Sequence, residues 1–197
     1  MGSIFFDLQK AFDSVNHSLL IEKLPYYGIA GKAQILLKSY LSNRYQHVLL
    51  KTSRTNVVSE WTKVYCGVPQ GSVLGPLLYL LYFNDLPEAL PAKIIPILYA
   101  DDTSIVITRP SIGELQQALT ASFHRLNGWF YENFLSLNFN KTYFLQFQNK
   151  NYNNSYTSIT LDNTPVTKID QIKFWGLTIN DSLTWNTHID GCSSTKG

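Results

Sequence analysis

Two adjacent carboxylates between two apolar runs constrain the fold of this chain more than any other feature. The runs 94–99 and 104–108 are typical of β-strands, and Ala100-Asp101-Asp102-Thr103 between them predicts a tight hairpin. Asp7 likewise ends the apolar run 3–8, which we expect to form a buried strand. Buried carboxylates need compensating cations, and adjacent like charges repel each other. Three such acids suit a divalent-metal site for phosphoryl transfer, whereas an Asp-Asp pair taken alone is more often a simple turn.

Hydrophobic periodicity predicts a mixed α+β fold. Helical spacing occurs at 18–24, 31–42, about 76–84 and 111–135, and the last helix has Ser111 as N-cap and Glu114 completing a capping box. In the helix 31–42 we expect an apolar side made of Ile35, Leu36, Leu37, Tyr40 and Leu41. Strand-like runs occur at 46–51 and 57–63, as a hairpin, and at 143–147, 158–161 and 174–179, with a mobile Asn-rich turn at 148–155. This order favours a sheet with helices packed on one side.

A locally basic stretch lies between residues 23 and 63, although the whole chain has a formal charge of only +2. Its only acid is Glu60, and its seven basic residues are Lys23, Lys32, Lys38, Arg44, Lys51, Arg54 and Lys63. With Tyr26, Tyr27, Tyr40 and Tyr45 interleaved, this stretch could follow a nucleic-acid backbone. The alternative is a solvated helix face followed by an edge strand that lysines protect from pairing.

Composition excludes several classes of protein. Hydrophobic residues make up 45% of the chain, which supports a packed core and is too apolar for a disordered chain. Cys66 and Cys192 are too few for a disulfide framework or a Cys-rich zinc site, and the four histidines lack metal-ligand spacing. The longest apolar run, 73–83, is too short to cross a bilayer, and no secretion signal precedes it. We therefore expect an intracellular protein, in the cytoplasm or the nucleus, with no membrane partner.

Five segments, in this order along the chain, resemble the palm of a reverse transcriptase from the non-LTR (LINE-type, jockey-like) retrotransposons. They are 6–17, 67–76, 99–103, 135–142 and 174–179. The resemblance implies an RNA-directed DNA polymerase that uses an RNA template, a DNA primer and deoxynucleoside triphosphates. It also implies a palm with an RRM- or ferredoxin-like antiparallel sheet, helices on one face, and motifs A to E within residues 1–180. We expect the fingers to be missing and the thumb to be truncated to its start at 181–197.

The resemblance assigns the chemistry to four acidic or basic side chains and one carbonyl. Asp7, Asp101 and Asp102 match the catalytic aspartates of the family, and with the carbonyl of Leu8 they are implied to bind two Mg²⁺ ions, or Mn²⁺. Lys141 matches a lysine that protonates the departing pyrophosphate. An exposed surface lysine is the alternative at this last position.

The resemblance also implies nucleotide and primer contacts. Phe12 matches the steric gate that excludes a 2′-hydroxyl, and Gln70 and Gly71 match the loop that positions the incoming nucleotide. Asp13 matches an acid of the family that we interpret as structural. The primer grip is implied to comprise Phe174, Trp175 and Gly176, where Trp175 replaces the usual leucine.

Two alternatives stay open at this point. A catalytically inactive or domesticated palm fragment could serve as a nucleic-acid-binding or interaction module, and RNA binding indifferent to Asp101→Asn would favour it. A group II intron or telomerase-like reverse transcriptase is a second alternative, which the segments 12–17 and 67–76 make less favourable than the LINE type.

Overall fold

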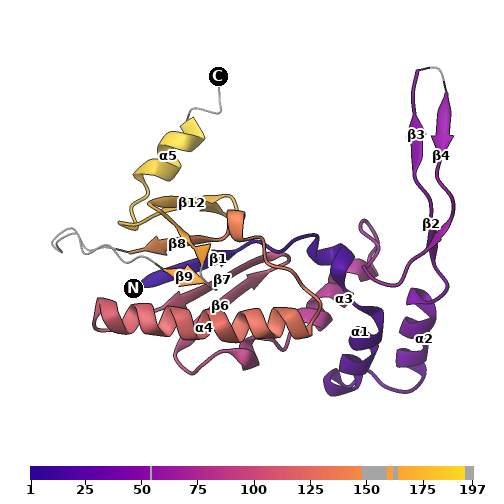
Figure 1. Cartoon of the computed structure of the whole chain (residues 1–197), viewed down its shortest axis with the longest axis horizontal. Coiled ribbons are helices and arrows are strands. Elements are labelled where there is room, and N and C mark those ends of the chain that lie inside the picture. The colour runs from indigo at the N-terminus through magenta and orange to yellow at the C-terminus, as the bar shows by residue number, and fades with distance from the viewer. Residues whose placement is uncertain (54, 148–158, 162–163, 194–197) are drawn as a thin grey trace. The chain divides into compact units, whose positions relative to one another are not determined.

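The computed structural model of this chain falls into two compact units, residues 1–9 with 85–197 and residues 10–84. It describes every residue except 54, 148–158, 162–163 and 194–197, which are drawn in grey in Figure 1. The Asn-rich turn predicted at 148–155, Arg54 of the basic stretch and the start of the predicted strand 158–161 lie outside the described residues. No helix in the described part of the chain is both long and apolar enough to cross a membrane.

A five-stranded sheet forms the centre of the first unit (Figure 1). Its strands, in spatial order, are β11 (Thr167–Ile169), β8 (Tyr143–Gln146), β1 (Gly2–Phe6), β7 (Asp102–Ile107) and β6 (Ile94–Tyr99). All neighbours are antiparallel except β11 and β8, which are parallel. The predicted α+β class and the predicted strands at 3–8, 94–99, 104–108 and 143–147 are confirmed, with small shifts at their ends.

Strand β1 is buried on both faces, which explains why its sequence is a continuous apolar run rather than an alternating one. The ring of Phe6 lies 6.0 Å from that of Phe130 in α4 (Ile112–Glu132), so the helix covers one face. The ring of Phe5 points to the other face and lies 5.1 Å from that of Phe174. Asp7 therefore directly follows a strand that is packed on both of its faces.

Helix α4 packs on the sheet through a stripe with helical spacing. The buried members of this stripe include Leu115, Leu119, Phe123, Leu126 and Phe130. Ser111 is the N-cap, as predicted, because its hydroxyl accepts a hydrogen bond from the Glu114 N–H at 3.3 Å. The helix ends at Glu132, three residues before the predicted end.

Strand β6 tolerates a proline because it lies at the edge of the sheet. Pro96 pairs with Ile105 of β7, and no further strand follows β6 on its other side in the described sheet. Proline has no backbone N–H to donate, and at this edge of the described sheet no neighbouring strand is present to accept from it.

The region predicted as one strand at 174–179 is a hairpin, so that prediction is wrong in its detail. Strands β12 (Gln171–Phe174) and β13 (Leu177–Asn180) pair antiparallel around a two-residue turn. Trp175 and Gly176 have φ values of 53° and 77°, and two successive left-handed residues reverse the chain.

Short elements complete this unit. They are the strands β9 (Thr160–Leu161) and β10 (Thr164–Pro165), the 3-10 helices η3 (Leu86–Ala89) and η4 (Phe139–Lys141), and the helix α5 (Asn186–Ser193).

The second unit combines helices with a long β-hairpin. Its helices are η1 (Ala11–Ser14), α1 (His17–Lys23), η2 (Leu24–Tyr27), α2 (Lys32–Leu41) and α3 (Leu74–Phe83). The hairpin pairs β2 (Tyr45–Gln46) with β5 (Thr62–Lys63) and β3 (Leu49–Lys51) with β4 (Asn56–Val58), which confirms the predicted hairpin with an interruption between the two ladders. The three predicted helices are confirmed within two residues at each end.

Two expectations for this unit are corrected. Only Leu41 of the predicted apolar side of α2 is buried, whereas Ile35 and Leu36 are 67% and 69% exposed. The first turn of α2 faces α1 through a different residue, because the Gln34 amide donates to the Ile21 carbonyl at 3.0 Å. Lys23 is buried rather than part of a solvated basic face. Its ammonium donates a hydrogen bond to the Tyr82 carbonyl at 2.9 Å and lies 5.0 Å from the centre of the Tyr82 ring.

Candidate active site

The β6–β7 hairpin places two carboxylates at one end of the sheet. Tyr99 pairs with Asp102, so Ala100 and Asp101 form the turn. Ala100 has a φ of 52°, a left-handed conformation that costs an alanine about 1 kcal/mol. Such strain is retained where the surrounding structure determines the conformation, and it is common at functional sites.

Asp7 reaches the same end of the sheet from the neighbouring strand. Phe6 pairs with Thr103 in the antiparallel β1–β7 ladder, so the next residues along, Asp7 and Asp102, continue the two adjacent strands. The Asp7 carboxylate is half-buried and accepts a hydrogen bond from the Asn138 side-chain amide at 2.9 Å. The ladder register therefore places the three predicted acids at the same end of the sheet.

The electrostatics agree with this arrangement. Partial burial raises the pKa of the Asp102 carboxyl above its usual value of 3.8, and the charges of Asp101 and Asp7 raise the pKa further. Asp102 is exposed as a residue, so the burial concerns only part of its carboxyl group. Mutual repulsion of this kind is relieved by protonation or by a cation.

The donor chemistry suits a hard divalent cation, because every candidate ligand is an oxygen. Backbone bonds on both sides of the Leu8–Leu137 bridge run from the Asn138 N–H to the Asp7 carbonyl and from the Gln9 N–H to the Ser136 carbonyl. In this pattern the Leu8 carbonyl accepts neither of the two hydrogen bonds that flank the bridge. Among the residues that the structure describes, however, no three His, Cys, Asp or Glu side chains are close enough together to hold a metal ion.

Asn138 is a site residue to which the sequence analysis assigned no role. Its side chain holds the Asp7 carboxylate, and its own N–H donates to the Asp7 carbonyl at 2.8 Å. Its carbonyl accepts from the N–H of Lys141, which follows in η4 and has an exposed side chain. The sequence shows only that a polar residue lies between Leu137 and Phe139, in the same segment as Lys141. Such a pattern does not indicate that the residue contacts an acid.

The implied nucleotide-contacting residues lie together in the second unit. The Val68 N–H donates to the Phe12 carbonyl at 2.9 Å, and the Gln70 amide donates to the Asp13 carboxylate at 3.0 Å. The ring of Phe12 stacks on that of Tyr79, with the ring centres 4.4 Å apart. Gly71 follows Gln70 with a φ of 79°, which glycine adopts without strain. Asp13 thus contacts Gln70, and its interpretation as a structural acid stays a prediction.

The turn of the β12–β13 hairpin lies beside the acidic turn. The ring centre of Trp175 is 5.1 Å from that of Tyr99, the residue immediately before Ala100. Phe174 anchors the hairpin because it is buried and packs edge-on against Phe5. The implied primer-grip residues and the acids therefore occupy the same end of the first unit.

Solved structures define the class of this fold as a polymerase palm. Apo telomerase from Candida Tropicalis, truncated from its C-terminal domain, has a TM-score of 0.56 at 17% identity over 93% of this chain and 34% of that chain. Telomerase from Candida Tropicalis in complex with the TWJ fragment of telomeric RNA has a TM-score of 0.57 at 14% identity, over 93% of this chain and 29% of the other. These likenesses concern the fold, and they confirm the palm that the sequence predicted.

The chain belongs to the reverse transcriptase (RNA-dependent DNA polymerase) family, whose sequence model matches residues 2–179. It is 33% identical to the probable RNA-directed DNA polymerase from transposon BS of Drosophila melanogaster, over 95% of this chain and 21% of that protein. It is 28% identical to the RNA-directed DNA polymerase from mobile element jockey of Drosophila melanogaster, over 94% of this chain and 20% of the relative. The predicted resemblance to non-LTR retrotransposon polymerases is confirmed, and the chain spans about a fifth of the length of these relatives.

Proposed function

We propose that this chain carries the nucleotidyl-transfer centre of an RNA-directed DNA polymerase. The observation that carries the proposal is that Asp7, Asp101 and Asp102 lie at the same end of the sheet, where partial burial and the charges of the other two acids raise the pKa of Asp102. Its partners are an RNA template, a DNA primer and deoxynucleoside triphosphates. The membership of the reverse transcriptase family supports this choice of substrates.

Reverse transcriptases generally depend on divalent metals, and here Asp7, Asp101, Asp102 and the Leu8 carbonyl would hold two Mg²⁺ ions. Bound ions of this kind lower the pKa of the primer 3′-hydroxyl and neutralise charge on the leaving pyrophosphate. Asn138 orients the Asp7 carboxylate through its amide hydrogen bond. Lys141 donates a proton to the departing pyrophosphate, which its exposed ammonium is free to approach.

The remaining roles concern substrate position. The Phe12 ring, supported by Tyr79, lies against the sugar of the incoming nucleotide, and Gln70 with Gly71 lines the nucleotide's path. The hairpin turn of Phe174, Trp175 and Gly176 holds the primer end beside the acidic turn. Residues 1–180 form the palm and 181–197 begin the thumb.

Primer extension on an RNA template tests this function. The proteins are the 197-residue chain and the jockey polymerase in which this chain replaces its matching segment. Extension that requires Mg²⁺ and stops with a chelator supports the proposal. A folded chimera that extends no primer, while the jockey polymerase itself does, contradicts it.

We expect Phe12→Val to raise ribonucleotide incorporation relative to deoxynucleotide incorporation by about tenfold, because valine leaves room for a 2′-hydroxyl. The ratio is measured in the chimera with single-nucleotide extension. Tyr131→Val is the matched control, since Tyr131 is an exposed aromatic residue within α4. An unchanged ratio in Phe12→Val would end the steric-gate assignment.

We expect Asn138→Leu to raise the Mg²⁺ concentration needed for half-maximal extension by about tenfold, because loss of a partner that orients a ligand weakens metal affinity by about this factor. Asn140→Leu is the control, because Asn140 is exposed in the same segment. Equal Mg²⁺ dependence in the two variants would show that the Asn138–Asp7 hydrogen bond does not orient the acid.

A further inference from the structure

We propose that single-stranded nucleic acid binds along β5 and the two residues after it, with phosphates on Arg44 and Lys63 and a base stacked on Tyr65. The proposal deepens the proposed polymerase function and rests on it, since the bound strand is then the single-stranded part of the template. All of the residues involved belong to the unit of residues 10–84.

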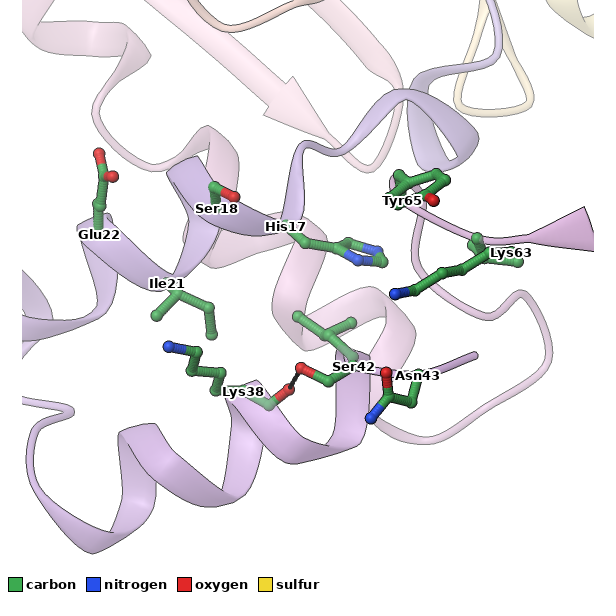
Figure 2. Close-up of a pocket in the computed structure, with 11 residues that line it drawn as sticks. His17, Ser18, Ile21, Glu22, Lys38, Ser42, Asn43, Lys63 and Tyr65 are labelled. Carbon is green, nitrogen blue, oxygen red and sulfur yellow. Dashed lines mark hydrogen bonds between the residues drawn. The ribbon is translucent and has the colours of Figure 1, made fainter. Parts of the chain in front are cut away.

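Two cavities are lined by the end of this strand and the residues that follow it. One, of about 450 Å³, lies between α1 and α2 and is lined by Lys38 and His17 (Figure 2). The other, of about 570 Å³, is lined by Lys10, Arg44 and Gln70. Lys63, Val64 and Tyr65 line both, so the cavities adjoin along the strand. Together they offer an extended path rather than a closed pocket for one small molecule.

The charge of the lining favours a polyanion. Four cationic side chains line the two cavities, namely Lys10, Lys38, Arg44 and Lys63, against two acids, Asp13 and Glu22. The Asp13 carboxylate already accepts the Gln70 amide. Figure 2 shows the Lys63 ammonium pointing into the cavity beside the His17 ring, where a phosphate could reach it.

Two exposed tyrosines provide faces for bases. Tyr65 is 72% exposed and Tyr45 is 57% exposed, and both line the larger cavity. The Lys63 ammonium lies 5.5 Å from the centre of the Tyr65 ring, which places a phosphate contact next to a stacking surface. Stacking on an aromatic ring is possible only for a base that is free of a duplex, so the combination selects a single strand.

Fluorescence anisotropy with labelled RNA and DNA oligonucleotides of the same sequence tests the site on the 197-residue chain. We expect the double variant Arg44→Gln with Lys63→Gln to raise Kd at least tenfold and to make binding less dependent on salt. Tyr65→Leu should raise Kd about tenfold, and Tyr65→Phe should restore most of the affinity because the ring is kept. An unlabelled duplex should compete poorly with the single strand.

Matched controls come from the same unit. Lys32 and Tyr26 are exposed and line neither cavity, so Lys32→Gln and Tyr26→Leu should bind like the parent. Circular dichroism confirms that each variant is folded. The proposal is overturned if Arg44, Lys63 and Tyr65 variants bind like these controls, or if Tyr65→Phe is as weak as Tyr65→Leu. Loss of primer extension with this binding pattern intact would count against the polymerase function alone.

Discussion

Asp102→Asn should reduce primer extension on the order of a thousandfold while leaving the metal-free protein at least as stable as the parent. The carboxylate is a proposed metal ligand, and an amide of the same shape is a much poorer one. Burial and the charges of Asp101 and Asp7 raise the pKa of Asp102, so its ionised form is unfavourable in the folded protein without a cation. The substitution should therefore lower polymerase activity without lowering the stability of the metal-free protein.

The pH dependence has a definite sign. The pKa of Asp102 in the folded protein lies above the ordinary value of 3.8. Below pH 3.8 the carboxyl is mostly protonated in both the folded and the unfolded protein, so Asp102 does not affect stability there. As the pH rises through the raised pKa, the folded parent acquires an unfavourable charge and loses stability that Asp102→Asn retains. The melting temperatures of the two proteins, without divalent ions, should therefore coincide near pH 3 and diverge towards neutral pH in favour of the variant.

Thermal melting by circular dichroism and primer extension in the chimera measure the two halves of this prediction. Asp170→Asn is the control, because Asp170 is an exposed acid between β11 and β12. It should leave extension unchanged and show no stabilisation. Retained synthesis in Asp102→Asn would refute the metal role, and a lower melting temperature at neutral pH would refute the electrostatic account.

Gly75→Ala should destabilise the fold by about 2–3 kcal/mol, because the first turn of α3 closes onto the preceding loop at this residue. An added Cβ would lie 2.5 Å from the Pro69 carbonyl oxygen and 3.1 Å from the Ser72 hydroxyl oxygen. That hydroxyl donates to the Pro69 carbonyl and accepts from the Gly75 N–H, so the loop has little room to shift. Because Gln70 and Gly71 lie in this loop, the chimera should also lose affinity for the nucleotide.

Urea unfolding measures the effect, and α4 supplies the matched substitution. Gly128 lies within α4, where an added Cβ meets no atom within 4 Å. Gly128→Ala should therefore stabilise the protein by about 0.5–1 kcal/mol through helix propensity. The same chemical change then has opposite signs at the two positions. Equal effects would show that the close approach of Gly75 to Pro69 does not govern stability.

Local patterns were sufficient for most elements of the fold. The acid pair between apolar runs indicated the β6–β7 hairpin, and Ser111 with Glu114 indicated where α4 begins. The 174–179 run was misread as one strand because its apolar residues continue through Trp175, which is an unusual residue for a left-handed turn position. The apolar spacing of α2 likewise predicted burial that this unit does not provide.

The amino-acid sequence by itself determined the identity of the three acids, the order of the motifs and the strand runs that carry them. These features depend on residue type and spacing along the chain, which are local properties. Only the tertiary structure decided that Asn138 holds Asp7, that Gln70 meets Asp13, and that Trp175 lies against Tyr99. Each of these contacts joins residues far apart in the chain, and its geometry follows from strand register and core packing, which no single segment encodes.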